Sequence, residues 1–244
     1  MLASFALALQ FLTRLPLNIN IKISDQRIAQ SVLFYPLVGL IIGILLVLLN
    51  QLCLSEQPTG LSAAIILSVW VLLTGGLHLD GLADCSDAWA GGLGDKQRTL
   101  AIMKDPAAGP IAVIILILVL LLKWAAIQAL LQHTALLALL SAPFIARLSI
   151  LILMLSTPYV RENGLGSAMQ QNLSKPLARL IVCLSLVLFV WLSNVYSLIA
   201  VLSVIALIRY LALQRIHGVT GDVYGASVEI VETVVLISWV LSNG

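Results

Sequence analysis

Long apolar runs without a single charged residue are the feature that most limits what this chain can fold into. They cover residues 31–54, 61–77 and 111–122. These runs approach or reach the roughly 20 residues that a helix needs to cross a bilayer. Only 10% of the 244 residues are charged, whereas a soluble domain carries roughly a quarter. The sequence therefore predicts an all-α, polytopic membrane protein.

Apolar length and helix breakers together predict about seven transmembrane helices. We expect them at residues 31–54, 61–78, 109–122, 134–156, 179–193, 197–213 and 226–241. The apolar stretch before Arg14 has about a dozen residues, which as a helix reach only about 18 Å. It is expected to form a short interfacial or re-entrant helix. No repeat or linker is visible, so residues 1–244 are interpreted as one integral membrane domain.

The basic residues indicate how the chain is oriented in the membrane. They precede the first expected span and follow the second, fourth and sixth, at Arg14, Lys22, Arg27, Lys96, Arg98, Lys104, Arg161, Lys175, Arg179, Arg209 and Arg215. Because cytoplasmic loops are enriched in Lys and Arg, these segments are expected in the cytoplasm. Lys123 is expected on the opposite side, and Arg147 lies inside the fourth span. The small net charge of +2 does not favour nucleic-acid binding.

The acidic residues carry the clearest indication of chemistry. Asp80, Asp84 and Asp87 are spaced i, i+4 and i+7, which on a helix places their carboxylates within about 60° of one another. Three like charges on one stripe repel unless a cation neutralises them, and hard oxygen ligands suit Mg²⁺, with Mn²⁺ as an alternative. The competing interpretation is a solvated cytoplasmic helix face. The neighbouring glycine and tryptophan residues argue against it.

A second acidic cluster follows near the C-terminus, in the segment GVTGDVYGASVEIVE. Asp222 and Glu229 are seven residues apart and share one helical face, whereas Glu232 lies about 80° from it. The small residues 225–227 between them allow another helix or a substrate to come close. A carboxylate inside a span costs roughly 2.5 kcal/mol or more when unpaired, so these glutamates are expected to face the bundle interior.

Between the two acidic clusters, Lys104 and Asp105 stand before a Pro-Ala-Ala-Gly-Pro turn. Lys104 and Arg14 could hold phosphate as point charges, or they could serve only to orient the chain in the membrane. Carboxylate stripes, a divalent cation and nearby basic residues together favour phosphoryl or nucleotidyl transfer. In such a reaction the metal bridges phosphate oxygens and a carboxylate takes the proton of an attacking hydroxyl. The sequence has no Walker A or dinucleotide-binding glycine motif.

Four motifs resemble, in order and spacing, those of the cobalamin synthase family, adenosylcobinamide-GDP ribazoletransferase. They are FLTRLP (11–16), GLHLDGLADCSDAWAGG (76–92), MKDPAAGP (103–110) and TGDVYGASVE (220–229). The second motif is the most specific of the four, and the first alone would be weak. The resemblance extends over almost the whole chain.

The resemblance implies a Mg²⁺-dependent enzyme of the bacterial inner membrane whose active site faces the cytoplasm. It would join α-ribazole or its 5′-phosphate to adenosylcobinamide-GDP and release GMP, in the late nucleotide-loop assembly of vitamin B12. The expected metal ligands are Asp80, Asp84, Asp87 and Asp222, and the expected catalytic residues are Asp80 and Glu229. Substrate contacts are expected from Arg14, Lys104, Asp105 and Thr220. The expected partners are both substrates and the lipid bilayer, with a second copy of the chain or other corrinoid-pathway enzymes as further candidates, and no nucleic acid.

Two other functions remain open at this point. The DGLAD segment (80–84) is similar to part of the motif of CDP-alcohol phosphotransferases, which also use carboxylate-bound metals. Asp84 stands where that motif has arginine, and the later aspartates of the motif are missing. The other alternative is a cation-coupled transporter whose interior carboxylates carry ions. The acidic residues here crowd one end of the spans, whereas a transporter places its key charges near the bilayer midplane.

Overall fold

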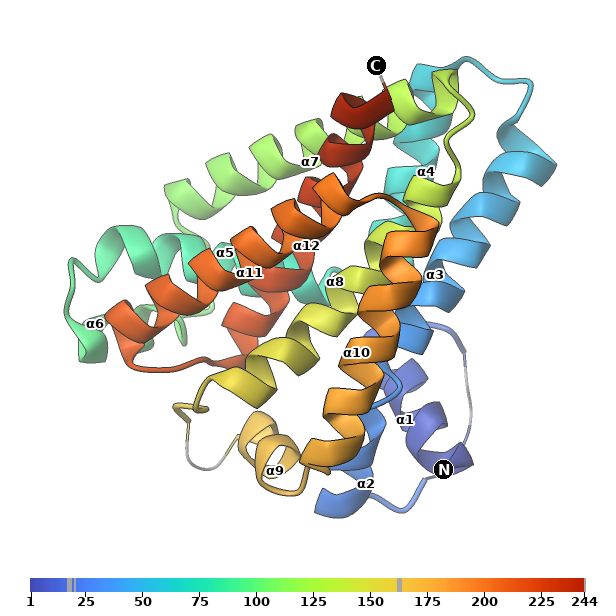
Figure 1. The fold of residues 1–244 in the computed structure, drawn as a ribbon. Helices are drawn as coiled ribbons and strands as arrows, with labels where there is room; N and C mark the ends of the chain where they lie inside the picture. The colour runs from blue at the N-terminus through green and yellow to red at the C-terminus, as the bar shows by residue number, and fades with distance from the viewer. Residues whose placement is uncertain (17–18, 20, 162–163, 244) are drawn as a thin grey trace.

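The structure is a computed structural model that describes residues 1–16, 19, 21–161 and 164–243. This part of the chain forms a bundle of helices and contains no β-strand (Figure 1). The elements are α1 (Leu2–Leu12), α2 (Asp25–Val32), α3 (Tyr35–Leu49), a π-helical turn η1 (Asn50–Leu54), α4 (Thr59–Thr74), α5 (Leu77–Gly91), α6 (Lys96–Ile102), α7 (Pro110–Gln132), α8 (Leu137–Ser156), α9 (Leu165–Gln171), α10 (Lys175–Leu192), α11 (Val195–Ile216) and α12 (Gly221–Asn243).

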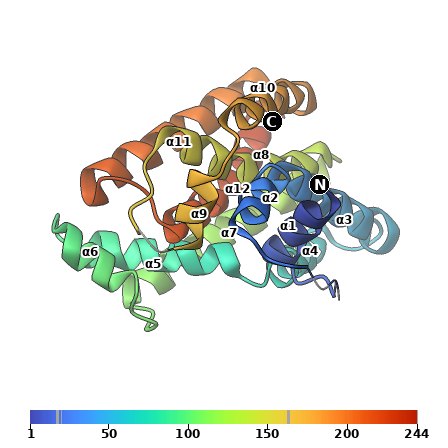
Figure 2. The ribbon, with the colours of Figure 1, turned by 90° about the horizontal axis from the view of Figure 1, so that it is seen from below.

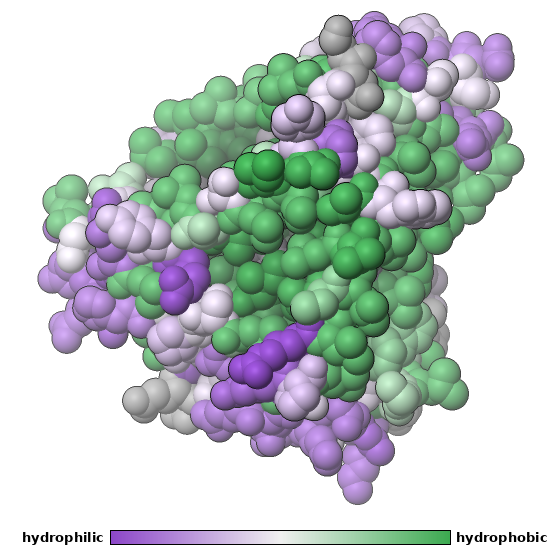
Figure 3. Space-filling view, viewed as in Figure 1, coloured by the Kyte–Doolittle hydropathy of each residue, from purple (hydrophilic) through white to green (hydrophobic). Residues whose placement is uncertain are grey.

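The described helices confirm a multi-pass membrane protein. Six of them are long and apolar enough to span a bilayer, namely α3 with η1, α7, α8, α10, α11 and α12. Helices α4 and α5 together would make a seventh, broken span, so the expected number of about seven is met. The expected N-terminal helix is α1, with 11 residues. The space-filling view shows a broad apolar band between polar ends, as a bilayer requires (Figure 3).

The span predicted at residues 61–78 ends earlier than expected. Helix α4 stops at Thr74, and α5 then leaves at 89° to it. Gly75 and Gly76 both adopt positive φ angles, of 64° and 69°, and their amides donate to the carbonyls of Leu72 and Val71. Two consecutive left-handed residues are accessible to glycine without steric cost, and they close a helix C-terminus in this way. The Gly-Gly pair therefore turns α5 away from the direction of the spans.

Helix α8 lies at the centre of the bundle and is buried along most of its length. Helix α3 packs closely against it because Gly39 and Gly43 present only hydrogen atoms to its backbone. A Cβ at Gly39 would stand 2.2 Å from the carbonyl oxygen of Pro143. Helices α10 and α12 pack against α8 as well. The short helices α1, α2 and α9 gather at the end of the bundle that carries the N-terminus, as the view from below shows (Figure 2).

Two basic and two acidic side chains form ion pairs in the middle of the bundle. Lys123 on α7 pairs with Glu229 and Glu232 of α12, and Arg147 on α8 pairs with Glu232. We call these four residues the buried charge cluster; none is more than 5% exposed. The prediction that Lys123 sits at the far membrane surface is therefore wrong. Its ammonium group faces inward because the two glutamates neutralise it there, as buried charges require. The same cluster supplies the partner of Arg147.

Candidate active site

Helix α5 carries the predicted acidic stripe and is held tightly against α12. Asp80, Asp84 and Asp87 do lie on one helix, as predicted. The two helices touch at Gly81 and Gly225, where a Cβ on Gly81 would stand 2.8 Å from the backbone oxygen of Asp222. The prediction that small residues of the second cluster admit a neighbouring helix is confirmed at Gly225. This glycine contact brings the carboxylates of both clusters to the same place.

Replacing Gly81 by alanine tests this contact. The added methyl group would collide with helix backbone rather than with a flexible side chain, so α5 and α12 would have to move apart. We expect the free energy of unfolding to fall by about 1–3 kcal/mol. Gly60→Ala on α4 is the matched control, because its Cβ would meet only the Gln128 side chain at an ordinary 3.6 Å. The stability of both variants is measured by thermal unfolding in detergent. Equal stability of Gly81→Ala and Gly60→Ala would show that α5 and α12 are not in tight contact at Gly81.

Asp222, at the start of α12, is oriented by side chains from two loops. Its Oδ2 accepts a hydrogen bond of 2.7 Å from Arg161 Nη2 and one of 3.2 Å from the Thr220 hydroxyl. Arg161 reaches it because the loop after α8 pairs with the loop before α12. The amide of Val160 donates to the carbonyl of Val219 at 2.9 Å. Thr220 is fully buried, so its predicted role in substrate binding would be exerted through Asp222.

The third motif also joins this region. Asp87 accepts hydrogen bonds from the amides of Gly109 and Ala112, at 2.5 and 2.9 Å. Asp87 therefore stabilises the first turn of α7, where free amides favour a negative charge. These contacts engage both carboxylate oxygens of Asp87, so they compete with its predicted role as a metal ligand. The Thr220 hydroxyl lies 3.8 Å from the sulfur of Met103, which links the loop before α7 to α12.

The predicted phosphate-binding residues lie on exposed segments around this region. The amide of Arg14 donates to the Leu73 carbonyl at 2.7 Å, and its side chain covers Gly75, directly before α5. Lys104 and Asp105 are exposed in the loop that follows α6. Asp105 accepts a hydrogen bond of 3.0 Å from the Ala107 amide, which shapes that loop. The four sequence motifs are thus neighbours in the fold.

A pocket of about 330 Å³ opens beside the crossing of α5 and α12. We call it the acidic pocket. It is lined by Phe11, Leu12, Tyr35, Leu77, His78, Asp80, Gly81, Ile150, Met154, Tyr159, Arg161, Gly164, Leu165, Gly166, Met169, Gly221, Asp222, Tyr224 and Gly225. Asp80 is exposed and Asp222 and Arg161 are partly exposed, whereas most of the apolar lining is buried. The charged groups therefore stand at the solvent side of an otherwise apolar pocket.

The carboxylates are close enough to influence one another. Asp84 is partly buried and lies near the carboxylates of Asp222 and Asp80, so their negative charges repel one another. A nearby cation would relieve this repulsion. Among the described residues, no three His, Cys, Asp or Glu side chains form a ready cage for a metal ion. Asp80 and Asp222 in the pocket lining, and Asp84 one turn further along α5, nevertheless offer carboxylates that fit Mg²⁺, which commonly binds one or two carboxylates together with substrate phosphates.

Glu229 is absent from the lining of the acidic pocket. Its side chain is 7% exposed and pairs with Lys123 in the buried charge cluster. A carboxylate held in this way is neutralised by its partner and has little contact with solvent. Its position favours a structural role, and its predicted role as a catalytic base gains no support from the pocket.

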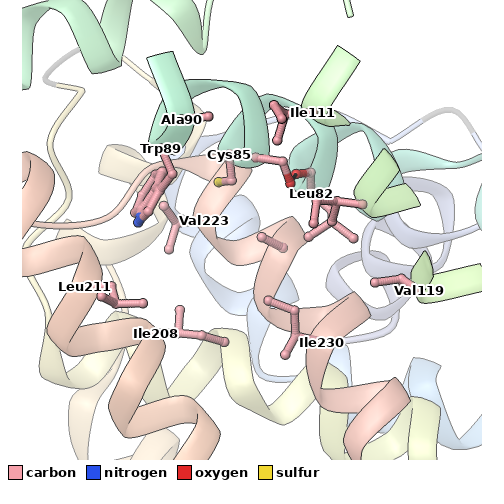
Figure 4. A pocket seen from close by; sticks show the side chains of 13 residues that line it. Leu82, Cys85, Trp89, Ala90, Ile111, Val119, Ile208, Leu211, Val223 and Ile230 are labelled. Carbon is pink, nitrogen blue, oxygen red and sulfur yellow. Dashed lines mark hydrogen bonds between the residues drawn. The ribbon is translucent and has the colours of Figure 1, made fainter. Parts of the chain in front are cut away.

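A second, larger cavity lies on the other side of α5. It encloses about 500 Å³ between α5, α7, α11 and α12, and its lining includes Cys85, Trp89, Ile115 and Ile208 (Figure 4). No charged side chain of the described residues lines it. Without a charged group, this apolar cavity offers nothing to bind phosphate, so the acidic pocket is the candidate for the chemistry.

Membrane-spanning helices and a polar-edged pocket with two carboxylates and an arginine define a multi-pass membrane protein with a site suited to phosphate chemistry. The chain belongs to the CobS family, described as cobalamin-5-phosphate synthase, whose family model matches residues 4–240.

The relatives agree with this assignment. An adenosylcobinamide-GDP ribazoletransferase of Pseudomonas fluorescens is 48% identical over 96% of this chain and 97% of its own length. The protein of the same name in Pseudomonas syringae pv. syringae is 49% identical over 97% and 98%. One from Acinetobacter baumannii is 45% identical over 99% and 98%. No solved structure matches the chain.

Sequence reasoning missed several residues of the pocket. The sequence pattern marks Arg161 only as a charge that orients the chain, whereas in the fold it pairs with Asp222. Tyr159 and Tyr224 stack with their ring centroids 6.0 Å apart, and both line the pocket. Arg161 and Tyr159 lie outside the four motifs, in a loop whose contacts depend on the tertiary fold. No local signal in the sequence marks them.

Proposed function

We propose that this protein transfers the adenosylcobinamide phosphate group of adenosylcobinamide-GDP to a ribose hydroxyl of α-ribazole or its 5′-phosphate. The products are GMP and adenosylcobalamin or its 5′-phosphate. The observation that carries the proposal is the acidic pocket, which Asp80 and Asp222 line from two helices and in which Asp222 pairs with Arg161. Relatives that share almost the whole chain bear the name of this activity. We further propose that the protein lies in the bacterial inner membrane with the pocket towards the cytoplasm.

The reaction needs a group that takes a proton. The ribose oxygen attacks the corrinoid-side phosphorus, and the bond from that phosphorus to the bridging oxygen breaks. GMP leaves with the bridging oxygen and its electron pair. We propose that Asp80 is the general base that accepts the proton of the attacking hydroxyl, because Asp80 lines the pocket and is exposed to solvent. A positioned carboxylate of this kind contributes roughly 10²- to 10⁴-fold to a rate.

The diphosphate needs positive charge around it. We propose that Asp222, in the pocket lining, and Asp84, beside that lining on α5 and close enough to interact with the charge of Asp222, hold Mg²⁺ or Mn²⁺. The ion would neutralise phosphate oxygens when bound. Arg161 lines the pocket beside Asp222 and has the planar donor fork that suits phosphate. Arg14 and Lys104, exposed on the neighbouring segments, would attract the donor's anionic end. The contribution of these two residues to donor binding is expected to weaken as the salt concentration rises.

The test is a two-product assay on the purified protein in detergent. With adenosylcobinamide-GDP, α-ribazole and Mg²⁺, GMP and the corrinoid product are expected to appear in equal amounts. Omission of either substrate, or addition of EDTA, is expected to stop both, and excess Mg²⁺ should restore them. Folded protein that forms no GMP under these conditions would refute the proposed function. GMP formed without the corrinoid product would indicate hydrolysis instead of transfer.

A further inference from the structure

The acidic pocket has the size and polarity of a site for the smaller of the two substrates. Its volume of about 330 Å³ lies near the lower end of the range for ligand pockets, roughly 300–1,000 Å³. A corrin macrocycle with its attached nucleotide is much too large to enter it. Leu12, Tyr35 and Met169 line its buried part. A flat, mostly apolar ring would bury well against these side chains.

Three residues that line this pocket each carry a buried polar atom without a hydrogen-bond partner among the described residues. One is Nε of Arg161, at the solvent side; the other two are Nδ1 of His78 on α5 and the hydroxyl of Tyr224 on α12. His78 is 3% exposed and Tyr224 6%. Buried polar groups are nearly always paired, because leaving one unpaired is costly. Tyr35, also on the wall, differs in that its hydroxyl already contacts the sulfur of Met169 at 4.0 Å.

This arrangement selects among the ring systems that the substrates carry. Guanine presents several donors and acceptors along its edge, and a largely apolar pocket would leave most of them unpaired. The benzimidazole of α-ribazole has one free ring nitrogen, and its ribose supplies hydroxyl groups. The unpaired atoms of His78 and Tyr224, on side chains that are themselves buried, match that pattern. The stacked rings of Tyr159 and Tyr224 add an aromatic surface to the same wall.

We propose that the acidic pocket is the acceptor site, and that His78 and Tyr224 bind α-ribazole by hydrogen bonds to its ring nitrogen and ribose. The benzimidazole ring fills the buried, apolar part. The ribose then faces Asp80 and Asp222 at the solvent side, where the transfer takes place. This inference rests on the proposed function, because it takes ribazole to be the acceptor. His78 and Tyr224 are thus two further substrate-binding residues. The acceptor occupies the small pocket, and the larger donor lies on its open, solvent side.

Binding of α-ribazole to the purified protein, measured calorimetrically without the corrinoid donor, tests the inference apart from turnover. Tyr224→Phe removes only the unpaired hydroxyl. It is expected to weaken ribazole binding about tenfold, as the loss of one good hydrogen bond does. The same variant should raise the melting temperature of the ligand-free protein by a few degrees, because a buried unpaired group is gone. Tyr210→Phe is the control, since Tyr210 is exposed on α11.

His78 is tested by a pair of variants. His78→Leu is expected to weaken ribazole binding about tenfold, whereas His78→Asn keeps a polar group near the place of Nδ1 and should recover part of the affinity. His133→Asn, in the exposed loop after α7, should change nothing. The affinity for GMP is measured in parallel. The assignment would be overturned if Tyr224→Phe bound ribazole as tightly as the wild type, or if the variant lost affinity for GMP and not for ribazole.

The two-product assay separates this inference from the proposed function. If the wild-type protein forms GMP and the corrinoid product but Tyr224→Phe binds ribazole normally, only the acceptor-site assignment fails. If the wild-type protein forms neither product although it is folded, the proposed function itself fails. Weakened ribazole binding in both Tyr224→Phe and His78→Leu, together with normal binding in the controls, supports the assignment.

Discussion

Replacing Asp80 by asparagine is expected to lower the rate of GMP release at least 100-fold while the protein remains folded. The substitution keeps the size of the side chain but removes its ability to accept a proton, and general base catalysis contributes roughly 10²- to 10⁴-fold. Asp80 is exposed on α5, so the change should hardly affect stability. The rate is measured with saturating substrates, and the melting temperature is measured on the same preparation.

Asp25→Asn is the matched control for this variant. Asp25 is also exposed, in the first turn of α2, and no substrate contact is assigned to it. It should keep nearly full activity. If Asp80→Asn retained activity within about threefold of the wild type, the assignment of the proton to Asp80 would be wrong, and another carboxylate of α5 or α12 would have to take that role.

The largest effect on stability is expected from Lys123→Met. This change leaves Glu229 without its cation inside the bundle and takes one of the two cations from Glu232. Removing one partner of a buried ion pair costs about 3–5 kcal/mol, because the remaining charge is uncompensated. We therefore expect a clearly lower melting temperature in detergent. Activity should fall only as far as the folded fraction does, since Lys123 is absent from the lining of the acidic pocket.

A second variant shows whether charge balance is the cause. In Lys123→Met combined with Glu229→Gln, Arg147 and Glu232 remain as a matched pair, so much of the lost stability should return. Lys22→Met, at an exposed position, should leave the melting temperature unchanged. A Lys123→Met protein as stable as the wild type would mean that the buried charge cluster does not hold α7 and α12 together.

The fold was predictable from the sequence wherever a local pattern determined it. The apolar runs indicated the membrane helices, and the spacing of Asp80, Asp84 and Asp87 indicated one helix with one acidic stripe, which α5 confirms. The small residue Gly225 marked a close helix contact correctly. Each of these features depends on neighbours within a few residues of sequence. The family was recognisable for the same reason, because its motifs are short and contiguous.

The rest depended on contacts between segments far apart in the sequence. Lys123 was interpreted from its position at the end of an apolar run, whereas its true environment is set by Glu229 and Glu232, more than 100 residues later. Asp87 has the spacing of a metal ligand, yet it binds amides of α7. Charge and spacing cannot distinguish a carboxylate that binds a metal from one that caps the start of a neighbouring helix, because both need an acid at a helix surface.

The central claim is that carboxylates of α5 and α12 form one metal-dependent transfer site. It is tested most directly by Mn²⁺ binding, followed by electron paramagnetic resonance, with adenosylcobinamide-GDP present and ribazole absent. We predict that Asp84→Asn and Asp222→Asn each weaken Mn²⁺ binding tenfold or more, which corresponds to about 1.4 kcal/mol. Asp80→Asn should stay within about threefold of the wild type. Mn²⁺ affinity that is unchanged in both Asp84→Asn and Asp222→Asn would contradict the account.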